Sequence, residues 1–186
     1  MSVIQRVAIQ GDRASFHEIA AHKYYKETVE LLYCETFQEV FEQLKRGSAS
    51  QAFVAVHNSA HGVIHEVETL ISQANVHIEG RYPLRIDQHL IVHPDATLDD
   101  IQTVLSHPVA LSQCDVFLAK LGRGVQSYHD TSAAVEYIRQ SCDRTLAAIG
   151  SEAAATLHGM KILKRSIQND QRNTTTFASL RILNTS

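Results

Sequence analysis

The sequence predicts an α/β protein of two lobes, with largely parallel sheets and a ligand cleft between the lobes. Three observations predict this class. Strand-like apolar stretches alternate with helix-like stretches almost from end to end. The tetrapeptide Gly-Arg-Tyr-Pro at residues 80–83 interrupts the alternation, and a second alternating run follows it. The length of 186 residues suits one large domain or two small lobes and is too short for several independent enzymes.

In the first run, apolar stretches predict strands at residues 3–9, 29–33 and 52–56, with a helix at 14–22. The next helix has the clearest signal. Thr36 and Glu39 form a capping box at its start, and Gly47 stands where a C-terminal glycine belongs. The apolar face of a third helix is marked by Val63, Val67, Leu70 and Ile71.

The second run begins with an extended stretch at 84–92 that is expected to cross between the lobes. The expected elements that follow are a strand near Val104, a helix at 108–121 closed by Gly122, a strand at 125–128, a helix at 131–139, a strand at 145–149, and a helix at 152–158 capped by Ser151 and closed by Gly159. Strands at 161–167 and 175–183 are expected to return to the first lobe. The predicted first lobe is therefore residues 1–83 plus 160–186, and the second is 84–159.

Composition and charge exclude several classes of function. The formal net charge is -3 and no Lys/Arg block occurs, which argues against a nucleic-acid or anionic-membrane surface. No apolar run approaches the roughly 18 residues of a membrane span. The N-terminus lacks the features of a signal peptide, so we expect a cytoplasmic protein. The three cysteines are too widely spaced for a disulfide framework or a zinc site, so we expect them reduced.

Neither the histidines nor the known catalytic and nucleotide-binding motifs indicate a metal or cofactor site. His57, His61 and His65 are spaced by four, but residues 58–62 interrupt a helix there. No H-E-x-x-H motif or other carboxylate–histidine spacing typical of a metal site accompanies them, so no metal is expected. The chain has no Walker loop, no G-x-S-x-G elbow and no G-x-G-x-x-G fingerprint. Non-covalent acid catalysis or simple binding remains, and no cofactor is expected.

Small polar residues gather at four predicted junctions between a strand and a helix. Such junctions are ordinary helix caps, but several of them around one cleft would also attract a small anion. The residues that we expect to face such a ligand are Ser15, Asn58, Ser59, Ser106 and Thr131.

Several blocks resemble the prephenate dehydratase family, in the order in which that family carries them. The most specific block is Ser-His-Pro-Val-Ala-Leu-Ser-Gln-Cys at 106–114. The others lie at 7–21, 37–47, 56–62, 130–134, 147–149 and 173–177. The resemblance implies two α/β lobes related to type II periplasmic binding proteins. It also implies a lyase that converts prephenate to phenylpyruvate, with loss of water and carbon dioxide, in phenylalanine biosynthesis.

The resemblance also implies roles for individual residues. Thr175, in the position of the family's Thr-Arg-Phe threonine, would be the acid, flanked by Thr174, Thr176 and Phe177 at the substrate. Asn58, Ser106 and Gln113 match positions linked to binding and site architecture. The substrate would be a small dianion, and a homodimer is possible. We expect no C-terminal regulatory ACT module and no chorismate mutase segment.

The chain departs from the family's motifs at positions that bear on function. Thr176 stands where the family has arginine, and His57 where it usually has glutamate. A protonated His57 would restore positive charge and would be a second candidate acid. Asp12 and Ala14 replace a proline and a glycine of the first block, which affects the path of that loop. Two alternatives stay open: a binding or regulatory protein without turnover, and a decarboxylase that does not aromatise prephenate. Whether arogenate is also accepted is left open.

Overall fold

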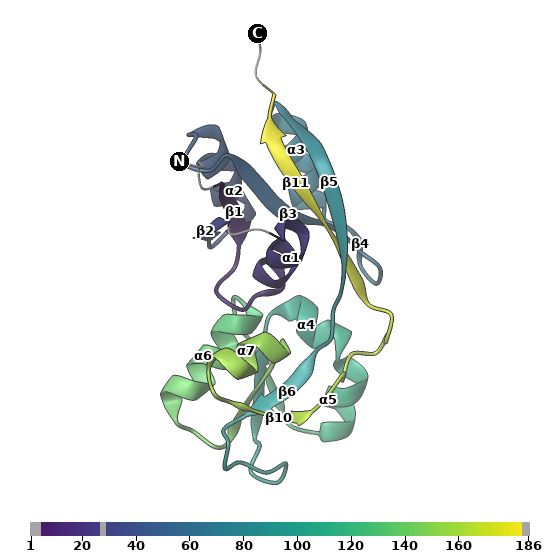
Figure 1. Cartoon of the computed structure of the whole chain (residues 1–186). Helices are drawn as coiled ribbons and strands as arrows, with labels where there is room; N and C mark the ends of the chain where they lie inside the picture. The colour runs from purple at the N-terminus through teal and green to yellow at the C-terminus, as the bar shows by residue number, and fades with distance from the viewer. Residues whose placement is uncertain (1–4, 27–28, 184–186) are drawn as a thin grey trace. The chain divides into compact units, whose positions relative to one another are not determined.

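The computed structural model describes residues 5–26 and 29–183, and these form an α/β protein (Figure 1). The chain divides into two compact units. Unit 1 contains Met1–Asp12, Phe16–Arg85 and Thr174–Ser186, whereas unit 2 contains Arg13–Ser15 and Ile86–Asn173. No helix in the described part of the chain has the length and apolar character needed to cross a membrane.

Unit 1 is built on one mixed sheet with the strand order β2-β1-β3-β11-β5, and β4 pairs with β3. Strand β1 is parallel to β2 and β3, whereas β11 is antiparallel to both of its neighbours, β3 and β5. Figure 1 shows β11, in yellow, beside β5. The elements are β1 (Arg6–Gln10), α1 (Phe16–Tyr25), β2 (Glu30–Cys34), α2 (Phe37–Lys45), β3 (Gln51–Asn58), β4 (Gly62–Val63), α3 (His65–Gln73), β5 (Val76–Arg85) and β11 (Thr174–Ile182).

The two faces of this sheet have different coverings. On one face, which we call the α3 face, Val54 of β3 packs in a buried cluster with Val67 and Leu70 of α3, and α2 joins the same cluster. On the other, the α1 face, the ring of Phe53 stacks on Phe177 and on Tyr24 of α1. Successive side chains of a strand point to opposite faces, so adjacent residues of β3 and β11 are divided between these two environments.

Unit 2 is built on a second mixed sheet with the order β10-β6-β9-β7-β8. Strands β9, β7 and β8 are parallel, and β6 and β10 are added antiparallel. Two buried apolar clusters lie in this unit, one with α4 and α5 and one with α6 and α7. The elements are β6 (His89–Val92), β7 (Thr103–Ser106), α4 (Pro108–Gln113), α5 (Asp115–Leu121), β8 (Gly124–Ser127), α6 (Thr131–Ser141), β9 (Leu146–Gly150), α7 (Glu152–Leu157) and β10 (Lys161–Lys164).

Local capping signals predict the helix ends well. The Thr36 hydroxyl accepts the Glu39 N–H over 3.1 Å at the start of α2, as the capping box indicates. Ser151 caps α7 in the same way, and Gly122 ends α5 in the left-handed conformation. The single helix expected at 108–121 is instead two short helices, because the backbone at Cys114 leaves helical geometry.

Two strands differ from the expectation. Strand β5 runs from Val76 through Pro83 to Arg85, across residues 80–83, where the sequence pattern predicts an interruption. Proline is tolerated there because β5 is the edge strand and pairs only with β11. The strand expected at 3–9 is β1 from Arg6 onward, and residues 3–4 lie outside the described residues.

The boundary between the units also differs from the expected one. Residues 160–173 belong to unit 2 and not to the first lobe, because β10 pairs with β6. Residues 84–85 belong to unit 1, because β5 is continuous to Arg85. The short loop Arg13–Ser15 also belongs to unit 2, where the hydroxyl of Ser132 bonds to the Arg13 carbonyl and that of Ser151 to the Ala14 carbonyl.

Candidate functional site

The candidate site in unit 1 is centred on the hydroxyl of Thr175. The Asn58 side-chain amide, at the end of β3, donates a hydrogen bond to Thr175 Oγ1 over 2.9 Å. The two residues are partners in the ladder between β3 and β11, and both are buried. A residue at the start of β11 is thus held by one at the end of β3.

The orientation of the Asn58 amide is fixed by its own oxygen. Asn58 Oδ1 accepts the backbone N–H groups of Ala60 (2.9 Å) and His61 (3.2 Å), so the NH₂ group must face Thr175. The threonine oxygen therefore accepts, and its own hydrogen points elsewhere. Among the described residues, none accepts that hydrogen. This geometry leaves the Thr175 O–H as a donor for a bound molecule.

Two hydrogen bonds between Ser59 and Thr174 join the end of β3 to the start of β11. The Ser59 N–H donates to the Thr174 carbonyl over 2.8 Å, and the Thr174 N–H donates to Ser59 Oγ over 2.9 Å. The Ser59 hydroxyl oxygen is therefore an acceptor within the fold. These two hydrogen bonds hold the neighbouring residues Asn58 and Thr175 in register.

A β-bulge places Asn58 on the same face as Thr175. Thr176 pairs with His57, but the next residue, Phe177, pairs with Ala55, so Val56 is an extra residue in β3. One extra residue reverses the alternation, which brings both Val56 and His57 to the α3 face and moves Asn58 to the α1 face. Without the bulge, Asn58 would point away from the Thr175 hydroxyl.

His17 of α1 supports this bulge and was not among the expected site residues. Its Nε2 accepts the Ala55 N–H over 3.2 Å, and its ring packs edge-on against Phe37 and Phe177. Burial lowers the pKa of His17 to about 3, so the imidazole is neutral and able to accept. Phe177 lies in this buried aromatic group and contributes packing.

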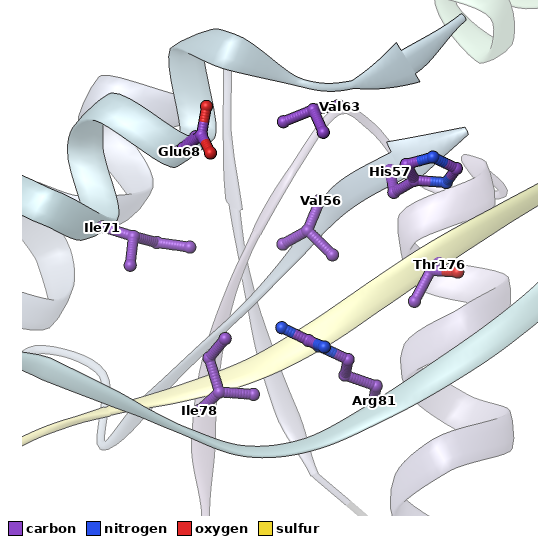
Figure 2. A pocket seen from close by; sticks show the side chains of 8 residues that line it. All are labelled: Val56, His57, Val63, Glu68, Ile71, Ile78, Arg81 and Thr176. Atoms are coloured by element: carbon purple, nitrogen blue, oxygen red, sulfur yellow. The ribbon is translucent and has the colours of Figure 1, made fainter. Parts of the chain in front are cut away.

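His57 and Thr176 line a pocket of about 460 Å³ on the α3 face (Figure 2). By the alternation of β11, this is the side of the sheet opposite the Thr175 hydroxyl. The other lining residues are Val56, Val63, Glu68, Ile71, Ile78 and Arg81. Both residues were expected at the substrate with Thr175. The alternation of β11 and the bulge in β3 separate them from it, so we assign His57 to this pocket and not to the proton transfer.

Four expected residues lie in unit 2: Ser15, in the loop Arg13–Ser15, and Ser106, Gln113 and Thr131. The Ser106 hydroxyl is fully buried and donates to the Ile149 carbonyl over 2.7 Å, so it joins the ends of β7 and β9. Gln113 is buried, and its side-chain oxygen accepts from the Gln88 amide over 3.4 Å. Thr131 is the first residue of α6. That these residues and the Asn58–Thr175 pair serve one ligand stays a prediction.

Two of the four helix starts expected to attract an anion are occupied by the protein's own caps. At α6, Asp130 Oδ1 accepts the N–H groups of Ser132 (2.7 Å) and Ala133 (3.0 Å). At α4, His107 Nδ1 accepts the Val109 N–H over 3.2 Å. The Asp130 carboxylate at the start of α6 also repels a second anion. At α4 the His107 ring occupies one N–H group and adds no negative charge.

The first polar loop keeps a glycine-like path without its second glycine. Ala14 adopts φ 61°, in the left-handed region, and Gly11 adopts φ 94°. The hydrogen bond from Ser151 to the Ala14 carbonyl (2.8 Å) fixes this conformation, and Ala14 is buried in unit 2. Ser15, the next residue, is also buried. A residue with a Cβ atom therefore adopts a left-handed conformation here, which costs strain.

His57, His61 and His65 do not form a cluster. His57 lies on β3 and His65 begins α3, and the described part of the chain contains no group of three potential metal ligands. The cysteines are free thiols, with Cys34 and Cys114 buried and Cys142 exposed.

Comparison with known proteins identifies the family. The family model described as prephenate dehydratase matches residues 7–183. The arogenate dehydratase/prephenate dehydratase 2 of Arabidopsis thaliana is 37% identical over 175 residues, and the bifunctional chorismate mutase/prephenate dehydratase of Escherichia coli (strain K12) is 35% identical over 179 residues. In both comparisons the match covers 94% of this chain but only 46% of the relative, so the chain spans about half the length of these relatives.

Solved structures show the same fold. The prephenate dehydratase of Arthrobacter aurescens in complex with L-Phe superimposes with a TM-score of 0.86 at 19% identity, covering 97% of this chain and 61% of that one. A periplasmic substrate-binding protein of an ABC transporter from Coxiella burnetii superimposes with a TM-score of 0.53 at 12% identity, covering 96% and 85%. Both likenesses concern the fold alone.

Proposed function

Because the chain belongs to the prephenate dehydratase family, we propose that it is a lyase that converts prephenate to phenylpyruvate, with loss of water and carbon dioxide. The observation that carries the proposal is the Asn58–Thr175 hydrogen bond. It makes the threonine oxygen an acceptor and so presents its O–H to a bound molecule.

The reaction needs little more than a donor for the departing oxygen. The bond between the ring and its carboxylate breaks and releases carbon dioxide, and its electron pair enters the ring. The ring hydroxyl departs with its own electron pair, receives a proton through Thr175 and leaves as water. The threonine regains its proton from solvent. Aromatisation drives the step, so a well-placed hydrogen-bond donor is the main chemical contribution required of the protein.

The two alternatives are less well supported. The departures at His57 and Thr176 favoured a protein without turnover, but both side chains lie on the α3 face. They therefore do not remove a group from beside Thr175. The curated relatives described above are both named as dehydratases, and the chain keeps the motif's threonine, which disfavours the non-aromatising decarboxylase.

The experiment is product analysis after incubation with prephenate, with arogenate in a parallel reaction. We expect phenylpyruvate from prephenate, and phenylalanine from arogenate if that substrate is also accepted. Thr175→Val keeps the shape of the side chain and should lower turnover by about 10². The matched control is Thr156→Val on α7, whose hydroxyl bonds only to the Glu152 carbonyl of its own helix.

If turnover of Thr175→Val stayed within a few-fold of wild type, Thr175 would not be the proton donor. A non-aromatic keto acid, or unchanged prephenate, would contradict the dehydratase proposal itself. The cytoplasmic location and the homodimer stay predictions from the sequence.

A further inference from the structure

The pocket on the α3 face of unit 1 contains a guanidinium, that of Arg81, for which residues 5–26 and 29–183 provide no ionic partner. Arg81 lies on β5, and among the residues that the structure describes no carboxylate forms an ion pair with it. Glu79, on the same strand, instead bonds to Arg181. Glu68, across the pocket on α3, contacts His65 at 3.3 Å. The positive charge of Arg81 is therefore not neutralised by the fold around it.

Half of the residues that line the pocket are aliphatic. Four of the eight lining residues are Val56, Val63, Ile71 and Ile78. Figure 2 shows the Arg81 guanidinium directed into the space between Ile78 and Val56. The volume of about 460 Å³ lies within the usual range for small-molecule sites, which are mostly apolar with a few polar groups that fix orientation.

We propose that this pocket is a second ligand site, which binds a small monocarboxylate with an apolar body. The Arg81 guanidinium would bind the carboxylate, because its paired N–H groups match the two oxygens. The hydroxyl of Thr176 and the imidazole of His57 are the neighbouring polar groups. The aliphatic side chains from β3, β4, β5 and α3 would cover the rest of the bound molecule.

The charge balance favours a monocarboxylate over a phosphate or a dicarboxylate. The pocket has one guanidinium, and Glu68 on the opposite wall repels additional negative charge. The site is also distinct from the Thr175 hydroxyl. Thr176 directly follows Thr175, and His57 directly precedes Asn58. Both Thr176 and His57 nevertheless face the other side of the sheet from the Thr175–Asn58 hydrogen bond. All the lining residues lie in unit 1.

The test uses 3-phenylpropanoate as the probe and 3-phenylpropanamide, of the same shape but uncharged, as the control ligand. Each is titrated into methyl-labelled full-length protein, and the NMR signals of Val56, Ile71 and Ile78 are followed. We expect saturable shifts of these methyl groups with the acid, and at least about tenfold weaker binding of the amide.

The variants assign the binding to Arg81. Arg81→Gln should weaken binding of the acid about tenfold, because a hydrogen bond to a charged group is lost. Arg81→Lys should retain part of the affinity. Arg6→Gln, the control, removes an exposed arginine of β1 that pairs with Glu30 and should change nothing.

A second variant leaves Arg81 in place. Thr176→Asp adds a competing carboxylate to the pocket. It should weaken binding of 3-phenylpropanoate about as much as Arg81→Gln does. Equal binding of the acid and the amide, or unchanged affinity in Arg81→Gln and Thr176→Asp, would overturn the proposal. Loss of the shifts in Thr175→Val would show that the probe binds at the Thr175 hydroxyl instead.

Discussion

His57 on β3 and Thr176 on β11 lie directly opposite each other in the antiparallel ladder. They are also the two positions where the family's motifs usually carry glutamate and arginine. Side chains at opposed positions on one face of a sheet interact, and opposite charges there attract. Both departures implied by the resemblance therefore fall on one cross-strand pair of this chain, on the face opposite the Thr175 hydroxyl.

This relationship predicts positive coupling between two reverting substitutions. Thr176→Arg alone brings a second guanidinium into the pocket of Arg81 and should lower the free energy of unfolding. His57→Glu added to it should recover about 0.2–1 kcal/mol beyond the sum of the single effects. A double-mutant cycle in urea measures this coupling. Additive effects would show that the two positions do not form a pair.

Asn58→Asp should abolish the donor function of Thr175 without removing its hydroxyl. The carboxylate still accepts from the N–H groups of Ala60 and His61, but it has no hydrogen to donate to Thr175. The threonine hydrogen then turns toward the carboxylate. We expect turnover of prephenate to fall by about 10², with the far-UV circular dichroism unchanged. Turnover near wild type would contradict the assigned direction of this hydrogen bond.

His17 should make the protein less stable as the pH falls. Burial lowers its pKa to about 3 from the ordinary 6.5, so between these values only the unfolded chain takes up the proton. The free energy of unfolding should therefore fall, below pH 6.5, by up to about 1.4 kcal/mol per pH unit from this group alone. Above pH 6.5 His17 is neutral in both states and contributes no pH dependence.

His17→Gln isolates this contribution. Glutamine offers an oxygen to the Ala55 N–H but does not titrate, so the variant should lose less stability than wild type between neutral pH and about pH 4.5. The other histidines are common to both proteins and cancel in the comparison. If the urea midpoint changed by the same amount between the two pH values in wild type and in His17→Gln, the assignment would be contradicted.

Cys142→Gly should stabilise the protein. Cys142 ends α6 with φ 53°, is exposed, and so pays the cost of the left-handed conformation without a compensating buried contact. Glycine should raise the free energy of unfolding by about 1 kcal/mol. Gly122→Ala is the converse test, because Gly122 ends α5 with φ 63° in open space and should lose a similar amount. No gain in Cys142→Gly would contradict the argument.

Elements whose signals are local were predictable from the sequence. The capping box at Thr36, the cap at Ser151 and the closing Gly122 all depend on residues a few positions apart, and each gives the helix boundary correctly. Strand β5 was missed because Pro83 argues against a strand unless the strand lies at a sheet edge. Edge position is a property of the whole sheet and has no local signal.

The candidate site divides in the same way. The motif resemblance singled out Thr175 and Asn58, which the structure brings into direct contact. It also grouped His57 with them, because sequence adjacency cannot show that a bulge at Val56 reverses the alternation. His17 carried no signal, since its partner is a backbone N–H freed by that bulge. Arg81 lies in residues 80–83, where the sequence pattern predicts an interruption between the two α/β runs and no site.

The position of β11 has a consequence for the order of folding. This strand lies between β3 and β5, yet it is synthesised after all of residues 86–173. Until β11 emerges from the ribosome, β3 and β5 each have an edge that lacks its final neighbour. Unpaired strand edges are sites at which nascent chains associate incorrectly. The contact between Asn58 and Thr175 spans 117 residues and is among the last to become possible. A nascent chain that lacks β11 also lacks Thr175, so it has neither a completed first sheet nor the proposed proton donor.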